Sequence, residues 1–238
     1  MRTFVLSLAL AAALAAGPAL AEPTELTVRA QSRDAKYIGT SMGGMEISLY
    51  DQASGKLLAK GLTEGGTGDT ASLVEEPRVR QVPVAGEGDA VFKATIDIDK
   101  PTLVRLEARG PLGHPDAAIT VTSMAWVLPG QAVVGDGWVV EVPGLVVTPS
   151  LADGRLTAKV VLMCGCPVTP GGLWDANAYE VTAWIAGAGG EATPVKLSYA
   201  GQASTFGIDF SAPSGTEVLV TAVDGRTGNT GVARFKVP

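Results

Sequence analysis

The two cysteines of this chain are separated by one residue, in the segment Met163-Cys164-Gly165-Cys166-Pro167. A predicted strand over residues 156–163 leads directly into them. If this strand stays extended, both thiols point to one face, because side chains alternate along a strand. Their Cα atoms would then lie roughly 6.5–7 Å apart, near the upper limit for a disulfide, whereas a bend at Gly165 would bring the sulfurs together.

Four interpretations of Cys164 and Cys166 follow. A local disulfide is the first, because an exported chain meets an oxidising environment. The second is a Cu(I) site formed by two thiolates, with Met42 and Met45 as thioether ligands if the two halves of the chain pack together, whereas Met163 should point away. The third is thiol exchange or a disulfide to a partner, and the fourth is a pair of buried free thiols. Zinc is disfavoured, since a structural site needs four ligands and His114 is the only histidine.

A G-x-S-x-G pattern occurs at Gly39-Thr40-Ser41-Met42-Gly43. In hydrolases this turn joins a strand to a helix and raises the serine as a nucleophile, and His114 follows in the required chain order. The residues after Gly43 instead predict a strand over 45–51. We therefore expect a glycine-rich loop here, and serine hydrolysis is only a third hypothesis.

Aromatic residues are scarce, so the four tryptophans, Trp126, Trp138, Trp174 and Trp184, stand out. Trp184 alternates with Thr182 and Ala186, and we expect it in the core. Trp174 and Asp175 lie in a Pro-Gly-Gly loop beside the cysteines. An exposed Trp174 would make this loop a binding site, while a buried one would cover the core as a plug.

The N-terminus predicts export. Arg2 is followed by an apolar run over residues 4–16 and then by Ala19-Leu20-Ala21, which has the form of a signal-peptide cleavage site. The run is too short for a membrane span. We expect a cleaved signal peptide over residues 1–21 and a mature chain that begins at Glu22, located in the periplasm or outside the cell and not spanning a membrane.

The amino-acid composition limits the classes of binding partner that we expect. The chain has 18 basic and 24 acidic residues and no basic run, so nucleic acid is not expected as a partner. Two cysteines cannot support a disulfide scaffold, and stability must therefore come from an apolar core.

Period-two alternation of apolar residues recurs along the chain, and helix-type spacing is nearly absent outside the signal. Val, Ile and Thr are frequent, and 30 Gly with 15 Pro separate the runs. This pattern predicts an all-β fold of two β-sandwich, immunoglobulin-like modules. We place the first at 22–149, with a long glycine-rich surface loop at 64–90, and the second at 150–238. We place the boundary near Pro149-Ser150, before an expected Asp-Gly turn at Asp153-Gly154.

Two segments resemble known families. Residues 220–237 contain an Ala-x-Asp strand end, a Gly-Asn turn and a final alternating strand, and they resemble the last hairpin of bacterial Ig-like domains. Residues 47–68 contain two strands around a Ser-Gly turn, and they are similar to the opening of prealbumin-like and carboxypeptidase-regulatory β-sandwiches. The first resemblance implies a stalk, adhesin or spacer rather than an enzyme.

The sequence therefore predicts an exported, non-enzymatic protein that binds a protein or a small molecule, with no cofactor. The alternative is a periplasmic copper-handling protein that uses Cys164 and Cys166.

Overall fold

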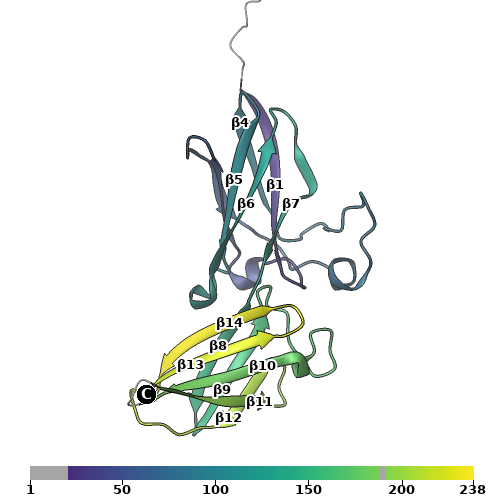
Figure 1. Ribbon diagram of the computed structural model, residues 1–238. Coiled ribbons are helices and arrows are strands. Elements are labelled where there is room, and N and C mark those ends of the chain that lie inside the picture. The colour runs from purple at the N-terminus through teal and green to yellow at the C-terminus, as the bar shows by residue number, and fades with distance from the viewer. Residues whose placement is uncertain (1–20, 188–190) are drawn as a thin grey trace, which may run out of the picture.

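The computed structural model describes residues 21–187 and 191–238, and it shows two β-sandwich modules arranged end to end (Figure 1). The N-terminal module contains β1 (Glu22–Ser32), β2 (Glu46–Asp51), β3 (Leu57–Leu62), β4 (Phe92–Ile98), β5 (Thr102–Gly110), β6 (Ile119–Val127) and β7 (Val133–Val142). The C-terminal module contains β8 (Leu145–Ala152), β9 (Arg155–Leu162), β10 (Tyr179–Ala186), β11 (Ala192–Tyr199), β12 (Thr205–Asp209), β13 (Glu217–Asp224) and β14 (Asn229–Lys236). The all-β prediction is confirmed.

The helical elements are single turns. Three are 3-10 turns, η1 (Thr40–Met42), η3 (Pro115–Ala117) and η4 (Ala176–Ala178), and one is a π turn, η2 (Ala71–Glu75). Within the described residues, none of these turns has the length and apolar character that a membrane crossing requires. The predicted signal peptide lies outside the described residues, except for its last position, residue 21.

In the N-terminal module, a sheet of order β4-β1-β7 faces a sheet of order β3-β2-β5-β6. The strand β1 pairs antiparallel with β4 and parallel with β7. Inward-facing residues alternate with outward-facing ones, as in β5, where Val104, Leu106 and Ala108 are fully buried. This alternation is the reason why the sequence pattern identified the fold.

The segment between β3 and β4 is not a plain surface loop. It lies over the outer side of β1, where the Arg29 guanidinium donates hydrogen bonds of 2.9 Å to the carbonyls of Asp89 and Ala90. Leu73 of η2 packs with Tyr37 and Ala90 in a small separate core. Most of residues 64–90 remain exposed or half-buried, but Leu73 and Ala90 are buried, because this segment covers one face of β1.

In the C-terminal module, seven strands form one hydrogen-bonded sheet of order β14-β13-β10-β11-β12-β9-β8, and it curves until β14 lies beside β8. The segment that resembles an Ig-like hairpin forms the β13–β14 hairpin, with Asp224 paired to Asn229 at its turn. Asp153 and Gly154 form the predicted turn between β8 and β9, with φ angles of 49° and 71°.

The change of module occurs at Pro143-Gly144, ahead of the boundary expected at Pro149-Ser150. Strand β7 pairs with β1, whereas β8 pairs with β9. The apolar run over residues 137–148 looked like one strand, but Gly144 turns the chain with a φ of 127°. The buried apolar residues of both modules nevertheless form one contiguous cluster.

Candidate functional site

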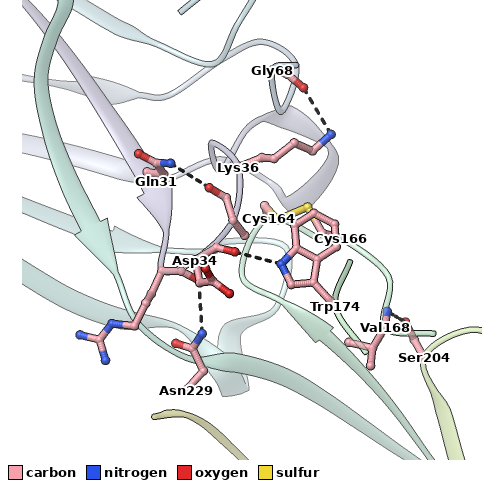
Figure 2. Close-up of a disulfide and its surroundings, with 12 residues drawn as sticks. Gln31, Asp34, Lys36, Gly68, Cys164, Cys166, Val168, Trp174, Ser204 and Asn229 are labelled. Carbon is pink, nitrogen blue, oxygen red and sulfur yellow. Dashed lines mark hydrogen bonds between the residues drawn. A yellow bond between two sulfur atoms is a disulfide. The ribbon is translucent and has the colours of Figure 1, made fainter. Parts of the chain in front are cut away.

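The first candidate site lies at the contact between the modules, which we call the joint. It comprises η1 and residues 33–35 on the N-terminal side, and the Cys164–Cys166 turn, the Trp174 loop and Asn229 on the C-terminal side (Figure 2).

The two cysteines form a disulfide with each other, as the first interpretation predicted. Strand β9 ends at Leu162, and the Gly165 amide donates a hydrogen bond of 2.7 Å to the Leu162 carbonyl. Gly165 has a φ of 82°, a bend that brings the two Cα atoms to 5.5 Å. Both cysteines are buried.

The methionines that were candidate copper ligands occupy three different places. Met42 of η1 crosses the joint, and a Cβ atom placed on Gly165 would lie 2.7 Å from its Sδ. Met45 instead faces Gly110 inside the N-terminal module, where a Cβ atom placed on Gly110 would lie 2.6 Å from the Met45 Sδ. The Met163 methyl group faces Gly144, at 3.0 Å from such a Cβ position. Only Met42 thus lies at the Cys-Gly-Cys turn.

Trp174 is a plug in the joint rather than an exposed anchor. Its side chain is only 8 % exposed, and its indole Nε1 donates a hydrogen bond of 2.9 Å to the Asp34 carbonyl (Figure 2). Asp175 shapes this loop, because its carboxylate accepts hydrogen bonds from the amides of Gly171 and Asn177. These bonds hold the pKa of Asp175 below its usual value.

Asn229 is a second connection across the joint, and it is fully buried. Its side-chain oxygen accepts a hydrogen bond of 2.8 Å from the Gly144 amide. Its side-chain nitrogen donates one of 3.2 Å to the Arg33 carbonyl (Figure 2). Asn229 therefore ties the linker between the modules to the turn that follows β1.

The joint contains the carboxylates of Asp34 and Asp224, with Arg226 nearby. Partial burial raises the pKa of Asp34, and the nearby carboxylate of Asp224 adds to this effect. Asp224 is buried and accepts hydrogen bonds from the Arg226 amide and the Thr227 hydroxyl. Burial, followed by the charge of Asp224, raises the pKa of Tyr179 well above its usual value.

The G-x-S-x-G segment forms η1 and lies between β1 and β2, without the strand-to-helix context of a hydrolase. Ser41 is exposed on this turn. The loop that carries His114 packs beside it, since the Gly113 amide donates a hydrogen bond of 2.8 Å to the Met42 carbonyl. Among the hydrogen bonds of the described residues, none joins Ser41 to His114, so no catalytic pair is formed there.

The second candidate site is a hollow of about 410 Å³ at the ends of β10, β13 and β14, lined by residues from both faces of these strands. Its floor includes Trp184, Leu219 and Phe235, and its charged residues are Glu217, Arg234 and Lys236. We call this site the hollow. Its apolar floor and charged margin suit contact with a ligand, and its volume falls within the usual range of ligand pockets, about 300–1,000 Å³.

The hollow was missed in the sequence because Trp184 was expected in the core. In fact Trp184 is 37 % exposed and donates a hydrogen bond of 3.1 Å to the Thr221 hydroxyl. The buried apolar residues of β10 are Tyr179, Val181 and Ala183, which is the phase opposite to Trp184, although Thr182 in the phase of Trp184 is buried as well. The sequence contains a sign of this exposure, because residues 183–186 are all apolar and do not alternate with polar residues.

Comparisons with known proteins give little further information. No family model matches the chain, and no curated protein matches it. Among solved structures, it is similar to a DUF3823 family protein from Bacteroides uniformis, with 13 % identity, a TM-score of 0.23, and coverage of 90 % of this chain and 100 % of that one. It is also similar to bovine butyrophilin, with 10 % identity, a TM-score of 0.25, and coverage of 90 % and 99 %. At these identities and TM-scores, nothing about this chain follows from those proteins.

Proposed function

We propose that this chain is an exported, non-enzymatic binding or interaction protein of the periplasm or the cell exterior, and that it binds through the hollow. The observation that carries this proposal is the partly exposed Trp184 on an apolar floor, because aromatic side chains with one open face are the usual anchors of recognition.

The charges at the margin indicate the ligand class. Glu217 and Lys236 lie 3.4 Å apart and form an ion pair. Arg234, directly opposite Leu219 on the neighbouring strand, has no carboxylate partner within 4 Å among the described residues. A guanidinium beside an apolar floor complements an apolar group that carries a negative charge. We therefore propose an aromatic or aliphatic anion, either free or as part of a protein partner.

Two dyes that differ in charge test this proposal. Anilinonaphthalene sulfonate carries a negative group, whereas N-phenyl-1-naphthylamine is its uncharged analogue. We expect Trp184→Ala to weaken the binding of both dyes, and Arg234→Gln to weaken only that of the sulfonate. Arg109→Gln, at an exposed position of the N-terminal module, is the matched control and should change neither. Equal binding of the sulfonate by parent and Arg234→Gln would refute the assigned site.

The export part of the proposal is tested separately. N-terminal sequencing of protein recovered from expressing cells should begin at Glu22. Recovery of a chain that retains Met1 would contradict export.

A second candidate function, Cu(I) handling, is favoured by the position of Met42. Its thioether lies against Gly165, the residue between the two cysteines, and reduction of the disulfide would free two thiols in the same turn. Two thiolates and one thioether are soft donors that suit Cu(I). A dithiol would supply the two electrons that break the S–S bond and would itself become a disulfide. The two new thiols then lose their protons to the solvent when they bind the metal.

Competition between the reduced protein and a chromogenic Cu(I) chelator, under anaerobic conditions, tests this function. We expect Met42→Leu to weaken Cu(I) binding and the double change Cys164→Ser, Cys166→Ser to abolish it. Met45→Leu is the matched control, since Met45 is buried away from the cysteines. Indifference of Cu(I) affinity to Met42→Leu would remove Met42 from the site, and no binding by the reduced parent would end the copper hypothesis.

A further inference from the structure

The turn that carries the disulfide touches both of the parts that fix the position of the N-terminal module. Gly165 packs against the Met42 thioether of that module, with no room for a Cβ atom between them. The residue before the first cysteine, Met163, packs against the link between the modules, since a Cβ atom placed on Gly144 would lie 3.0 Å from its methyl carbon. A change in the shape of residues 163–166 would therefore reach the N-terminal module and the link at the same time.

Few polar contacts hold the two modules together. Among the described residues, two hydrogen bonds cross from one module to the other (Figure 2). One joins the Trp174 indole to the Asp34 carbonyl, and the other joins the Asn229 amide to the Arg33 carbonyl. Trp174 belongs to the loop that follows the disulfide, so one of these two bonds depends on the same segment. Because the chain passes between the modules only once, their relative position depends on these contacts.

Reduction of the disulfide would change the shape of this turn. Both cysteines are buried, with exposed fractions of 2 % and 4 %. Once the bond is broken, the two sulfur atoms must separate to van der Waals contact, because non-bonded atoms cannot lie as close together as bonded ones. Neither sulfur can turn towards solvent without displacing its neighbours, and Met42 already fills the space beside Gly165. A close-packed interior responds to such a change by moving to another packing rather than by gradual compression.

We propose that the Cys164–Cys166 disulfide is a redox switch of the joint. In the oxidised form, the turn holds the two modules as one body. In the reduced form, the turn widens against Met42, the Trp174 hydrogen bond to the other module opens, and the N-terminal module moves about Pro143-Gly144. Both modules stay folded, because each keeps its own sheets and its own buried residues. This switch involves neither the hollow nor a metal ion.

The reductant in this step is a dithiol. One of its thiolates attacks a sulfur of the disulfide, the bond between Cys164 and Cys166 breaks, and a mixed disulfide forms while the released cysteine takes up a proton. The second thiol of the reductant then displaces the other cysteine, which also takes up a proton. The reductant is thereby oxidised to a disulfide, and it supplies the two electrons and the two protons that the protein gains. Because both sulfurs are buried, this attack needs a local opening of the joint.

Two indole groups allow the joint to be compared with the interior of a module. The Trp174 indole donates its hydrogen bond of 2.9 Å across the joint to the Asp34 carbonyl, whereas the Trp138 indole donates one of 3.1 Å to the Ser123 hydroxyl within the N-terminal module. The test is hydrogen exchange of both indole groups in the isotopically labelled mature chain, measured by NMR before and after reduction with dithiothreitol. Reduction should speed the exchange of Trp174 by about tenfold or more and leave that of Trp138 unchanged.

Variants separate the effect of the bond from that of the reductant. The double change Cys164→Ser, Cys166→Ser should show fast exchange at Trp174 with and without dithiothreitol. Met42→Ala makes room beside Gly165, so the ratio of the reduced to the oxidised exchange rate at Trp174 should be smaller than in the parent. Met45→Ala is the matched control, because Met45 is buried away from the joint, and it should keep the parent ratio. Circular dichroism establishes that each variant is folded.

Several outcomes would overturn the switch. Exchange at Trp174 that does not change on reduction would show that the joint stays closed without the bond. Equal acceleration at Trp138 would show that reduction loosens the whole N-terminal module rather than the joint. A disulfide that dithiothreitol cannot reduce in the folded protein, as judged by mass after alkylation of free thiols, would exclude a switch. An unchanged rate ratio in Met42→Ala would remove the contact through which the turn is proposed to act.

Discussion

The joint and the hollow each centre on one tryptophan of the C-terminal module, but the two residues have opposite surroundings. Trp174 is 8 % exposed, and its indole nitrogen is bonded to a carbonyl of the other module. Trp184 is 37 % exposed, and its indole nitrogen is bonded to a neighbouring strand of its own sheet. The partner surface of Trp174 belongs to the same chain, whereas Trp184 keeps an exposed face among the residues that the structure describes. We therefore expect the joint to stabilise the protein, whereas the hollow is the surface that we propose for binding.

The largest expected effect comes from removing these two side chains in turn. Trp174→Ala should lower the free energy of unfolding by about 3 kcal/mol, because a large buried side chain leaves a cavity that the two modules cannot close. Trp184→Ala should lower it by about 1 kcal/mol or less, since much of its surface is already in water. Denaturant unfolding of both variants measures the difference. Equal decreases in the free energy of unfolding would show that the two tryptophans contribute equally to stability, which would contradict this comparison.

Asn229→Ala should have the next largest effect. It leaves the buried Gly144 amide and the Arg33 carbonyl without their hydrogen-bond partner, which we expect to lower the free energy of unfolding by about 2 kcal/mol. Asn177→Ala is the matched control, because Asn177 is exposed at the end of its loop. A loss for Asn229→Ala no larger than that of the control would contradict its role as a connection across the joint.

The disulfide should matter much less for stability than its position in the joint suggests. Because Cys164 and Cys166 are separated by one residue, their bond barely restricts the unfolded chain. The double change Cys164→Ala, Cys166→Ala should lower the free energy of unfolding by about 1 kcal/mol, well under the usual 2–5 kcal/mol. Unfolding of the parent with and without a dithiol reductant gives an independent value. A loss as large as that of Trp174→Ala would make the bond a structural element of the joint.

The smallest expected effect is a pH dependence at the joint. The pKa of Asp34 is raised in the folded protein, so its contribution to stability is fully present below the ordinary carboxyl pKa and is lost as the pH rises through the raised value. Asp34→Asn has no such charge to desolvate. The variant should therefore be slightly more stable than the parent near neutral pH and no more stable below about pH 3.5. Denaturant midpoints at the two pH values measure this, and a difference that does not change with pH would contradict it.

Local patterns in the sequence were sufficient to predict the strands. Alternation identified β5 and the β13–β14 hairpin, and Asp153-Gly154 predicted the turn after β8, because these features depend on neighbouring residues. The local disulfide could also be predicted, since both cysteines and the bend at Gly165 lie within one segment.

Features that depend on contacts between distant segments could not be predicted in this way. Met42 can lie beside Gly165 only if the two modules pack together, and the sequence does not show whether they do. The phase of β10 is similar, because Trp184 and Val181 are both apolar and only the surrounding strands determine which one points inward. The change of module at Gly144 could not be predicted either, because apolar residues continue on both sides of this glycine.

The most direct test of the binding hypothesis is to locate the ligand on the isotopically labelled protein by NMR. On titration with anilinonaphthalene sulfonate, we expect amide shift changes concentrated at Trp184, Leu219 and Arg234 on the outer face of β10, β13 and β14. The amides of the joint, such as those of Cys166 and Trp174, should not move. Shift changes centred on the joint or on β6, with the hollow unaffected, would contradict the account.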